Sequence, residues 1–197
     1  MKHAKKNHAM ISAAVLAIVA ATAVACGRPS DATPATTSTP GNSGQDALTD
    51  SSQVTSLIQA GLTQIDKKNW SAAATSFQQA LAINPGNIYA NYDLGVIAQT
   101  TGQSSAAISY YKKVLAVNAA YTPAMYNEAI LLESSHPQQA IAMYQKIVKI
   151  NPRAATAYLR LALVQAEQGN ITDAKENDAK AVAIDPALSK YKLPVKS

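Results

Sequence analysis

Residues 81–85 read Leu-Ala-Ile-Asn-Pro, and this short string returns three more times along the chain in closely related form. The later copies are Leu115-Ala116-Val117-Asn118-Ala119, Val148-Lys149-Ile150-Asn151-Pro152 and Val182-Ala183-Ile184-Asp185-Pro186. Their last positions step by 34, 33 and 34 residues, so the chain holds four copies of one unit. Because proline disfavours helical geometry in the residue before it, each string is typical of a helix end.

Two columns of small residues keep the same step and indicate what lies inside each unit. One column is Ala73, Ala107, Ala140 and Ala174, and the other is Gly61, Gly95, Ala129 and Ala162. In the second copy the helical spacing of apolar residues stops at Gly102 and resumes from Ala107. This pattern predicts two antiparallel helices that pack closely in each copy. Large aromatic residues at Phe77, Tyr111 and Tyr144 are then expected to fill the space between copies.

These units resemble tetratricopeptide repeats in their small-residue columns, their aromatic column and their terminal proline. The resemblance implies an all-α fold, an α-solenoid of four helix–turn–helix repeats. We place the repeats at residues 54–87, 88–121, 122–154 and 155–188. The sequence departs from the family where Lys68 replaces the usual turn glycine and Ala119 replaces the terminal proline. The tryptophan column of the first helix holds other residues, which are Leu57, Asn91, Met125 and Tyr158.

The third repeat is one residue shorter than the others, and the deletion falls in its turn. Ala129 and Ala140 are eleven positions apart, whereas the matching pairs elsewhere are twelve apart. Pro137 suits the first turn of the following helix, where no N–H group is needed. His136, the one histidine after the N-terminal segment, is interpreted as a turn or cap residue.

The N-terminal segment, residues 1–25, is interpreted as an export signal. Three lysines precede residues 9–25, which carry no charge. The string Ala23-Val24-Ala25-Cys26 resembles the lipobox of bacterial lipoproteins, although leucine is commoner at the first position. That resemblance implies cleavage before Cys26, lipidation of Cys26, and a location on the outer face of the cytoplasmic membrane, or on an outer membrane if the cell has one. Ordinary signal cleavage and an uncleaved anchor remain open alternatives.

Residues 26–53 are expected to form a flexible tether, and residues 189–197 a basic tail. The tether is rich in Ser, Thr, Pro and Gly and has no aromatic residue, so it cannot bury enough surface to fold. The capping-box spacing of Asp50 and Gln53 predicts the start of the first helix there. In the last repeat Asp178 replaces the aromatic residue, which predicts an outward polar face and an array that ends at the fourth copy.

Composition argues against enzymatic, metal-binding and nucleic-acid-binding functions. The 197-residue chain has one cysteine and three histidines, and no phosphate-binding glycine loop or catalytic triad pattern. Its net charge of +5 includes the signal lysines, and the repeats alone carry ten basic against nine acidic residues. We therefore expect no catalytic activity, cofactor, nucleic-acid partner or small-molecule substrate.

The family resemblance implies that the first helices of the repeats line a concave surface that binds a peptide or protein partner. The candidate groove residues are Ile58, Leu62, Tyr89, Tyr92, Val96, Tyr126, Asn127, Ile130, Leu159, Arg160 and Leu163. They form an apolar, tyrosine-rich stripe. Some members of the family bind the carboxylate of a peptide here, but the acidic side chain of Asp93 would repel such a ligand. The sequence thus predicts an interaction scaffold on a lipid anchor at Cys26. A self-associating envelope module and an accessory subunit of an envelope enzyme or secretion complex stay open as alternatives.

Overall fold

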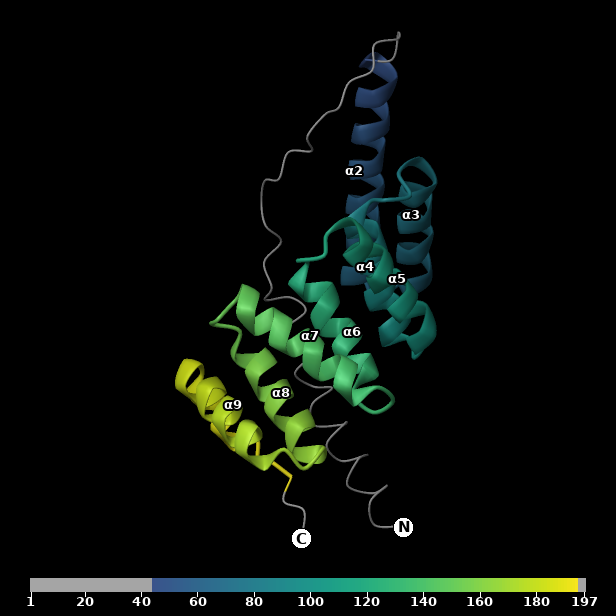
Figure 1. The fold of residues 1–197 in the computed structure, drawn as a ribbon. Coiled ribbons are helices and arrows are strands. Elements are labelled where there is room, and N and C mark those ends of the chain that lie inside the picture. Colours follow the sequence, from purple (N-terminus) through teal and green to yellow (C-terminus); the bar gives the residue numbers. More distant parts are fainter. Residues whose placement is uncertain (1–43, 195–197) are drawn as a thin grey trace. The chain divides into compact units, whose positions relative to one another are not determined.

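The computed structural model describes residues 44–194, with side chains from Asp50 onward. The predicted signal segment, Cys26 and most of the predicted tether lie outside the described residues. The described part contains eight α-helices and no strand (Figure 1). The helices are α2 (Gly44–Asp66), α3 (Trp70–Ile83), α4 (Ile88–Thr100), α5 (Ser104–Val117), α6 (Thr122–Leu132), α7 (Pro137–Ile150), α8 (Ala155–Glu167) and α9 (Ile171–Ile184). A short 3-10 helix, η1 (Pro186–Lys190), follows α9.

The helices fall into pairs, each joined by a short turn, as the repeat spacing predicts. The pairs are α2 with α3, α4 with α5, α6 with α7, and α8 with α9, and the second helix of each pair also contacts the first helix of the next. The second, third and fourth pairs begin at Ile88, Thr122 and Ala155. These are the positions at which the sequence placed the second, third and fourth repeats.

The start of the first helix was predicted wrongly. Helix α2 begins at Gly44, so Asp50 lies inside the helix and does not cap it. A capping-box spacing marks a helix start only where the preceding residues cannot be helical, and the last proline of the predicted tether is Pro40. Val54 is the first buried residue of the described chain, so the predicted boundary coincides with the start of packing.

In the first two pairs, a glycine of the first helix lies directly against an aromatic ring of the second helix. Ala73, Ala107, Ala140 and Ala174 are completely buried. A Cβ atom added to Gly61 would lie 2.6 Å from the ring of Phe77, and one added to Gly95 would lie 2.5 Å from the ring of Tyr111. The glycines are therefore needed because an aromatic ring occupies the space that a side chain would fill.

The turns within the repeats differ in backbone geometry. Gly102 and Gly169 adopt the left-handed conformation, with φ angles of 78° and 86°. Lys68 adopts it too, with a φ angle of 56°. The lysine that replaces the usual turn glycine therefore keeps the left-handed conformation that glycine adopts most readily. In the shorter third turn His136 is the N-cap residue of α7 and Pro137 is at its first turn, as predicted.

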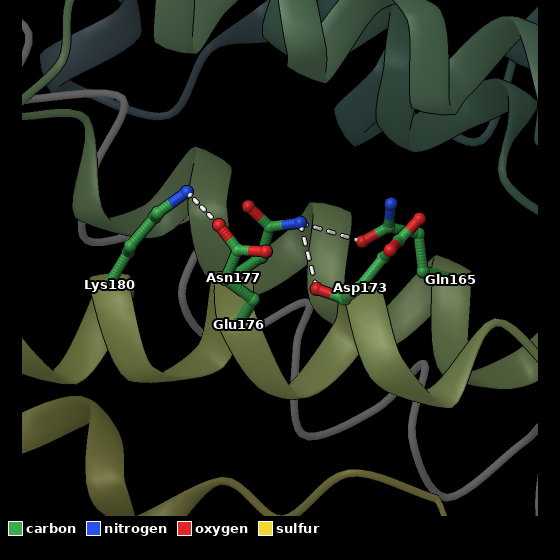
Figure 2. Close-up of polar contacts among 5 residues, drawn as sticks. All are labelled: Gln165, Asp173, Glu176, Asn177 and Lys180. Carbon is green, nitrogen blue, oxygen red and sulfur yellow. Dashed lines mark hydrogen bonds and ion pairs between the residues drawn. The ribbon is translucent and has the colours of Figure 1, made fainter.

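The last repeat presents a polar surface along most of α9. Asn177 Nδ2 donates to Gln165 Oε1 on α8 at 2.8 Å and to the carbonyl oxygen of Asp173 at 3.0 Å (Figure 2). Exposed Lys180 and Glu176 form an ion pair at 2.7 Å. Asp178 departs from the prediction because it is half-buried and does not lie on the outward face. Its column faces the interior of the repeat in every copy.

Candidate functional site

Seven of the predicted groove residues form a half-buried surface on the first helices, which we call the first-helix face. They come from α2, α4 and α6, and are Ile58, Leu62, Tyr89, Tyr92, Val96, Tyr126 and Ile130. Most of them pack on one side against the core clusters of their repeats. Each still has exposed apolar surface, which a partner could bury.

The other four predicted groove residues are buried in the structure. Asn127, Leu159, Arg160 and Leu163 are each at most slightly exposed. Asn127 and Arg160 lie in the contacts between repeats, because each reaches from a first helix toward the tyrosines of the preceding repeat. Their side chains are therefore engaged inside the protein and are not presented to solvent.

A group of uncharged polar side chains joins the second repeat to the third. This neutral junction consists of Tyr92, Gln99, Tyr111 and Asn127. The Tyr111 hydroxyl donates to Gln99 Oε1 at 2.7 Å. Asn127 Nδ2 donates to the hydroxyls of Tyr92 and Tyr111, at 3.3 and 3.4 Å. The ring centroids of Tyr92 and Tyr111 are 6.0 Å apart, so stacking and hydrogen bonding act on the same residues.

The corresponding group between the third and fourth repeats carries charge. This charged junction consists of Tyr126, Glu133, Tyr144 and Arg160, which occupy the same repeat positions as the four residues of the neutral junction. The Tyr144 hydroxyl donates to Glu133 Oε1 at 2.7 Å. Arg160 Nε lies 3.0 Å from the same oxygen, in ion-pair contact without hydrogen-bond alignment. The rings of Tyr126 and Tyr144 meet edge to face, with centroids 5.8 Å apart.

Burial sets the protonation of both junctions. It raises the pKa of the Tyr111 and Tyr144 hydroxyls, which therefore stay protonated and act as donors at neutral pH. Burial also raises the pKa of the Glu133 carboxyl, although Arg160 and the hydrogen bond from Tyr144 work in the opposite direction. The charged junction thus holds a carboxylate that is paired but incompletely hydrated.

The first junction of the array is different again, because three of its four matching positions are apolar. These three hold Ile58, Ile65 and Phe77, and the fourth holds Asp93, which is buried. The three junctions therefore differ in the chemistry that they place at the same four repeat positions. The aromatic column predicted Tyr111 and Tyr144 as packing residues only, without polar partners at Gln99 and Glu133. Gln99 precedes Tyr111 by twelve residues, and Glu133 precedes Tyr144 by eleven. This nearly constant sequence separation is the signal that could have predicted the two hydrogen-bonded pairs.

Between residues 44 and 194, no three His, Cys, Asp or Glu side chains come together in a way that could hold a metal ion. Among the described helices, none combines the length and the apolar character needed to cross a membrane.

Comparison with known families identifies the repeat. Family models described as tetratricopeptide repeats match residues 64–127 and residues 130–188. The chain belongs to the tetratricopeptide repeat family. The fold is accordingly an all-α tetratricopeptide solenoid, and the family resemblance drawn from the repeat columns is confirmed. A comparison with curated protein sequences gave no significant match.

Solved structures show the same fold. The crystal structure of MamA has a TM-score of 0.64 and 24% identity, over 75% of this chain and 87% of MamA. A MamA fragment from Desulfovibrio magneticus RS-1 has a TM-score of 0.61 and 20% identity, over 68% and 76% of the two chains. YrrB, a tetratricopeptide protein described as having an unusual peptide-binding site, has a TM-score of 0.62 and 24% identity, over 72% and 74%. At these identities the likeness establishes the fold.

A tetratricopeptide solenoid is a scaffold for protein–protein interaction. Its stacked repeats create an extended surface that offers side chains from several helices to one partner. In this chain the first-helix face is the part of that surface which combines tyrosines with aliphatic residues.

Proposed function

We propose that this protein is a non-catalytic scaffold, displayed outside the cytoplasmic membrane on a lipid anchor, that binds a mostly apolar segment of a protein partner on its first-helix face. The observation that carries the proposal is the half-buried row of tyrosine and aliphatic side chains on α2, α4 and α6. Tyrosine contributes large apolar contact area together with a hydroxyl group, and it is enriched among residues that dominate binding energy.

The charges near this face favour an apolar ligand over an anionic one. Arg160 is already neutralised by Glu133 at 3.0 Å, and Asp93 is buried on α4. A carboxylate placed here would meet no unpaired cation of this cluster and would lie near an acidic residue. The first-helix face therefore suits a segment recognised by its apolar side chains.

Photo-crosslinking in cells tests the binding face without removing any junction contact. A crosslinking amino acid is placed at Tyr89 or Val96 on α4, and at exposed Gln145 on α7 as the matched control. We expect one protein to be captured from both α4 positions and not from Gln145. Capture of a second copy of this chain instead would favour the self-association alternative, and equal capture at all three positions would refute a defined binding face.

The anchor is tested separately, because it lies in the part of the chain outside residues 44–194. Its support is the sequence Ala23-Val24-Ala25-Cys26. Cells fed a clickable fatty acid are expected to label the wild-type chain and not the Cys26→Ser variant. Label retained by the variant, or absent from the wild type, would contradict lipidation at Cys26.

A further inference from the structure

The C-terminal end of the array contains an open pocket of about 510 Å³ between α9 and the residues that follow η1. Its walls are mainly apolar, with Val182 and Ala183 on α9 and Leu193 on the opposite side. Asp178 also lines this pocket. The pocket therefore combines an apolar wall with one acidic side chain, Asp178, and one basic side chain, Lys192.

Asp178 has a buried carboxylate oxygen that no hydrogen-bond donor of the described residues satisfies. Its Oδ1 atom is enclosed and accepts no hydrogen bond from the described residues. Two other polar residues of α9 are engaged elsewhere: Asn177 donates to Gln165, and Lys180 pairs with Glu176 (Figure 2). Lys192, the cation of the pocket wall, donates to the carbonyl oxygen of Ser189 at 3.1 Å. An enclosed carboxylate oxygen without a donor lowers stability, so a ligand that supplies one is favoured.

In the neutral and charged junctions, the residue of the next first helix places a donor group next to the aromatic column. Tyr111, in the column of Asp178, accepts a hydrogen bond from Asn127, sixteen residues later on the next first helix. Tyr144 has Arg160 at the same spacing, close enough to influence its pKa. Sixteen residues after Asp178 stands Pro194, which has no donor group. Residues 189–194 occupy the register of a fifth first helix, yet beyond η1 they form no helix.

We propose that this pocket is a docking site for a helical segment of a protein partner that carries an arginine or lysine. The basic side chain pairs with Asp178, as Asn127 and Arg160 meet the aromatic column in the earlier junctions. Apolar side chains of the same helix pack against Val182, Ala183 and Leu193. This site is separate from the first-helix face and extends the array by one helix supplied in trans.

A peptide with the sequence of residues 154–168, AATAYLRLALVQAEQ, is a suitable probe because it presents Arg160 from an authentic first helix of this chain. Binding of the labelled peptide to the full chain is followed by fluorescence anisotropy. We expect saturable binding that Asp178→Asn weakens by about tenfold or more, which corresponds to about 1.4 kcal/mol. Glu176→Gln, an exposed change on the same helix, is the matched control and should leave binding unchanged.

A charge reversal makes the test specific. The chain with Asp178→Arg should bind the original peptide poorly and bind a peptide with Arg160→Glu well. Binding that does not depend on residue 178, or no binding to the wild type, would overturn the proposal. Tyr89→Ala should not change peptide binding, so failure here is distinguishable from failure of the first-helix face.

Discussion

The neutral and charged junctions solve the same packing problem with different chemistry. In both, a tyrosine of the aromatic column donates at 2.7 Å to a side chain twelve or eleven residues earlier, which is Gln99 in one and Glu133 in the other. The residue from the next repeat is an amide in the first case and a guanidinium in the second. The repeat geometry therefore determines the positions of the polar groups in these two junctions, whereas the groups themselves can be neutral or charged.

The difference has a thermodynamic consequence. A neutral group that loses its partner leaves one hydrogen bond unmade, whereas a buried ion that loses its partner keeps its full charge in a poorly hydrated site. Stability should thus depend more strongly on single residues in the charged junction than on their equivalents in the neutral one.

The largest expected effect comes from Arg160→Asn, which places the neutral junction's amide in the charged junction. We expect a loss of about 2–3 kcal/mol in the free energy of unfolding, below the range for a fully buried pair because Glu133 retains some exposure. Urea unfolding at neutral pH measures the loss. Asn127→Ala is the comparison, with an expected loss of about 1 kcal/mol. Equal losses would mean that charge makes no difference between the junctions.

Removal of a single tyrosine hydroxyl from each junction also compares the charged junction with the neutral one, with smaller expected losses of stability. Tyr144→Phe removes a hydrogen bond to a carboxylate and should lower the free energy of unfolding by about 2 kcal/mol. Tyr111→Phe removes the hydrogen bond to the Gln99 amide and the longer one from Asn127, both between neutral groups, and should lower it by about 1 kcal/mol. The ring and its packing are kept in both variants. Urea midpoints measured side by side decide the order, and a larger loss for Tyr111→Phe would contradict it.

Much of the fold was predictable from the sequence because packing in a repeat array is local. Each small residue must face a partner one helix away, so the columns at Gly95 and Ala107 fix the pairing of α4 with α5. The beginning of α2 was not predictable in the same way. A capping signal at Asp50 reports local preference only, and the helix continues through it to Gly44.

The candidate site was predicted less completely than the fold. Helical periodicity places Asn127 and Arg160 on the same face as Tyr92, but it does not report how far a long side chain reaches. In the structure these two side chains extend into the preceding repeat and are buried there. Asp178 shows the same limit, since its polarity indicated an outward face while its column position placed it half inside.

Gly95→Ala tests how tightly the neutral junction is closed. The added Cβ would lie 2.5 Å from the ring of Tyr111, which must then shift. Overpacking of this kind costs about 1–3 kcal/mol, and the better helix propensity of alanine offsets about 1 kcal/mol, so we expect a net loss of about 1 kcal/mol. Gly86→Ala is the control, because its nearest neighbour would be 3.7 Å away. Thermal unfolding that separates the two variants supports the tight contact, and identical curves would refute it.

The smallest expected change in stability comes from converting the charged junction into a copy of the neutral one with Glu133→Gln and Arg160→Asn together. Replacing a whole buried ion pair is often close to neutral, so we expect a change within about 1 kcal/mol, far less than the loss from Arg160→Asn alone.

The pH dependence of this double variant is the sharper measurement. Burial raises the pKa of Glu133, so between its ordinary and raised values the folded chain binds this proton more than the unfolded chain does. The free energy of unfolding therefore falls as the pH rises through that interval, and this contribution is present in full only at lower pH. The double variant lacks the carboxyl, so its stability should fall less steeply over the same interval in urea titrations at several pH values. Glu128, whose pKa burial also raises, is present in both proteins and cancels in the difference. A wild-type slope equal to that of the double variant would show that Glu133 titrates alike in the folded and unfolded chains, and the two junctions would then differ in side-chain identity but not in electrostatics.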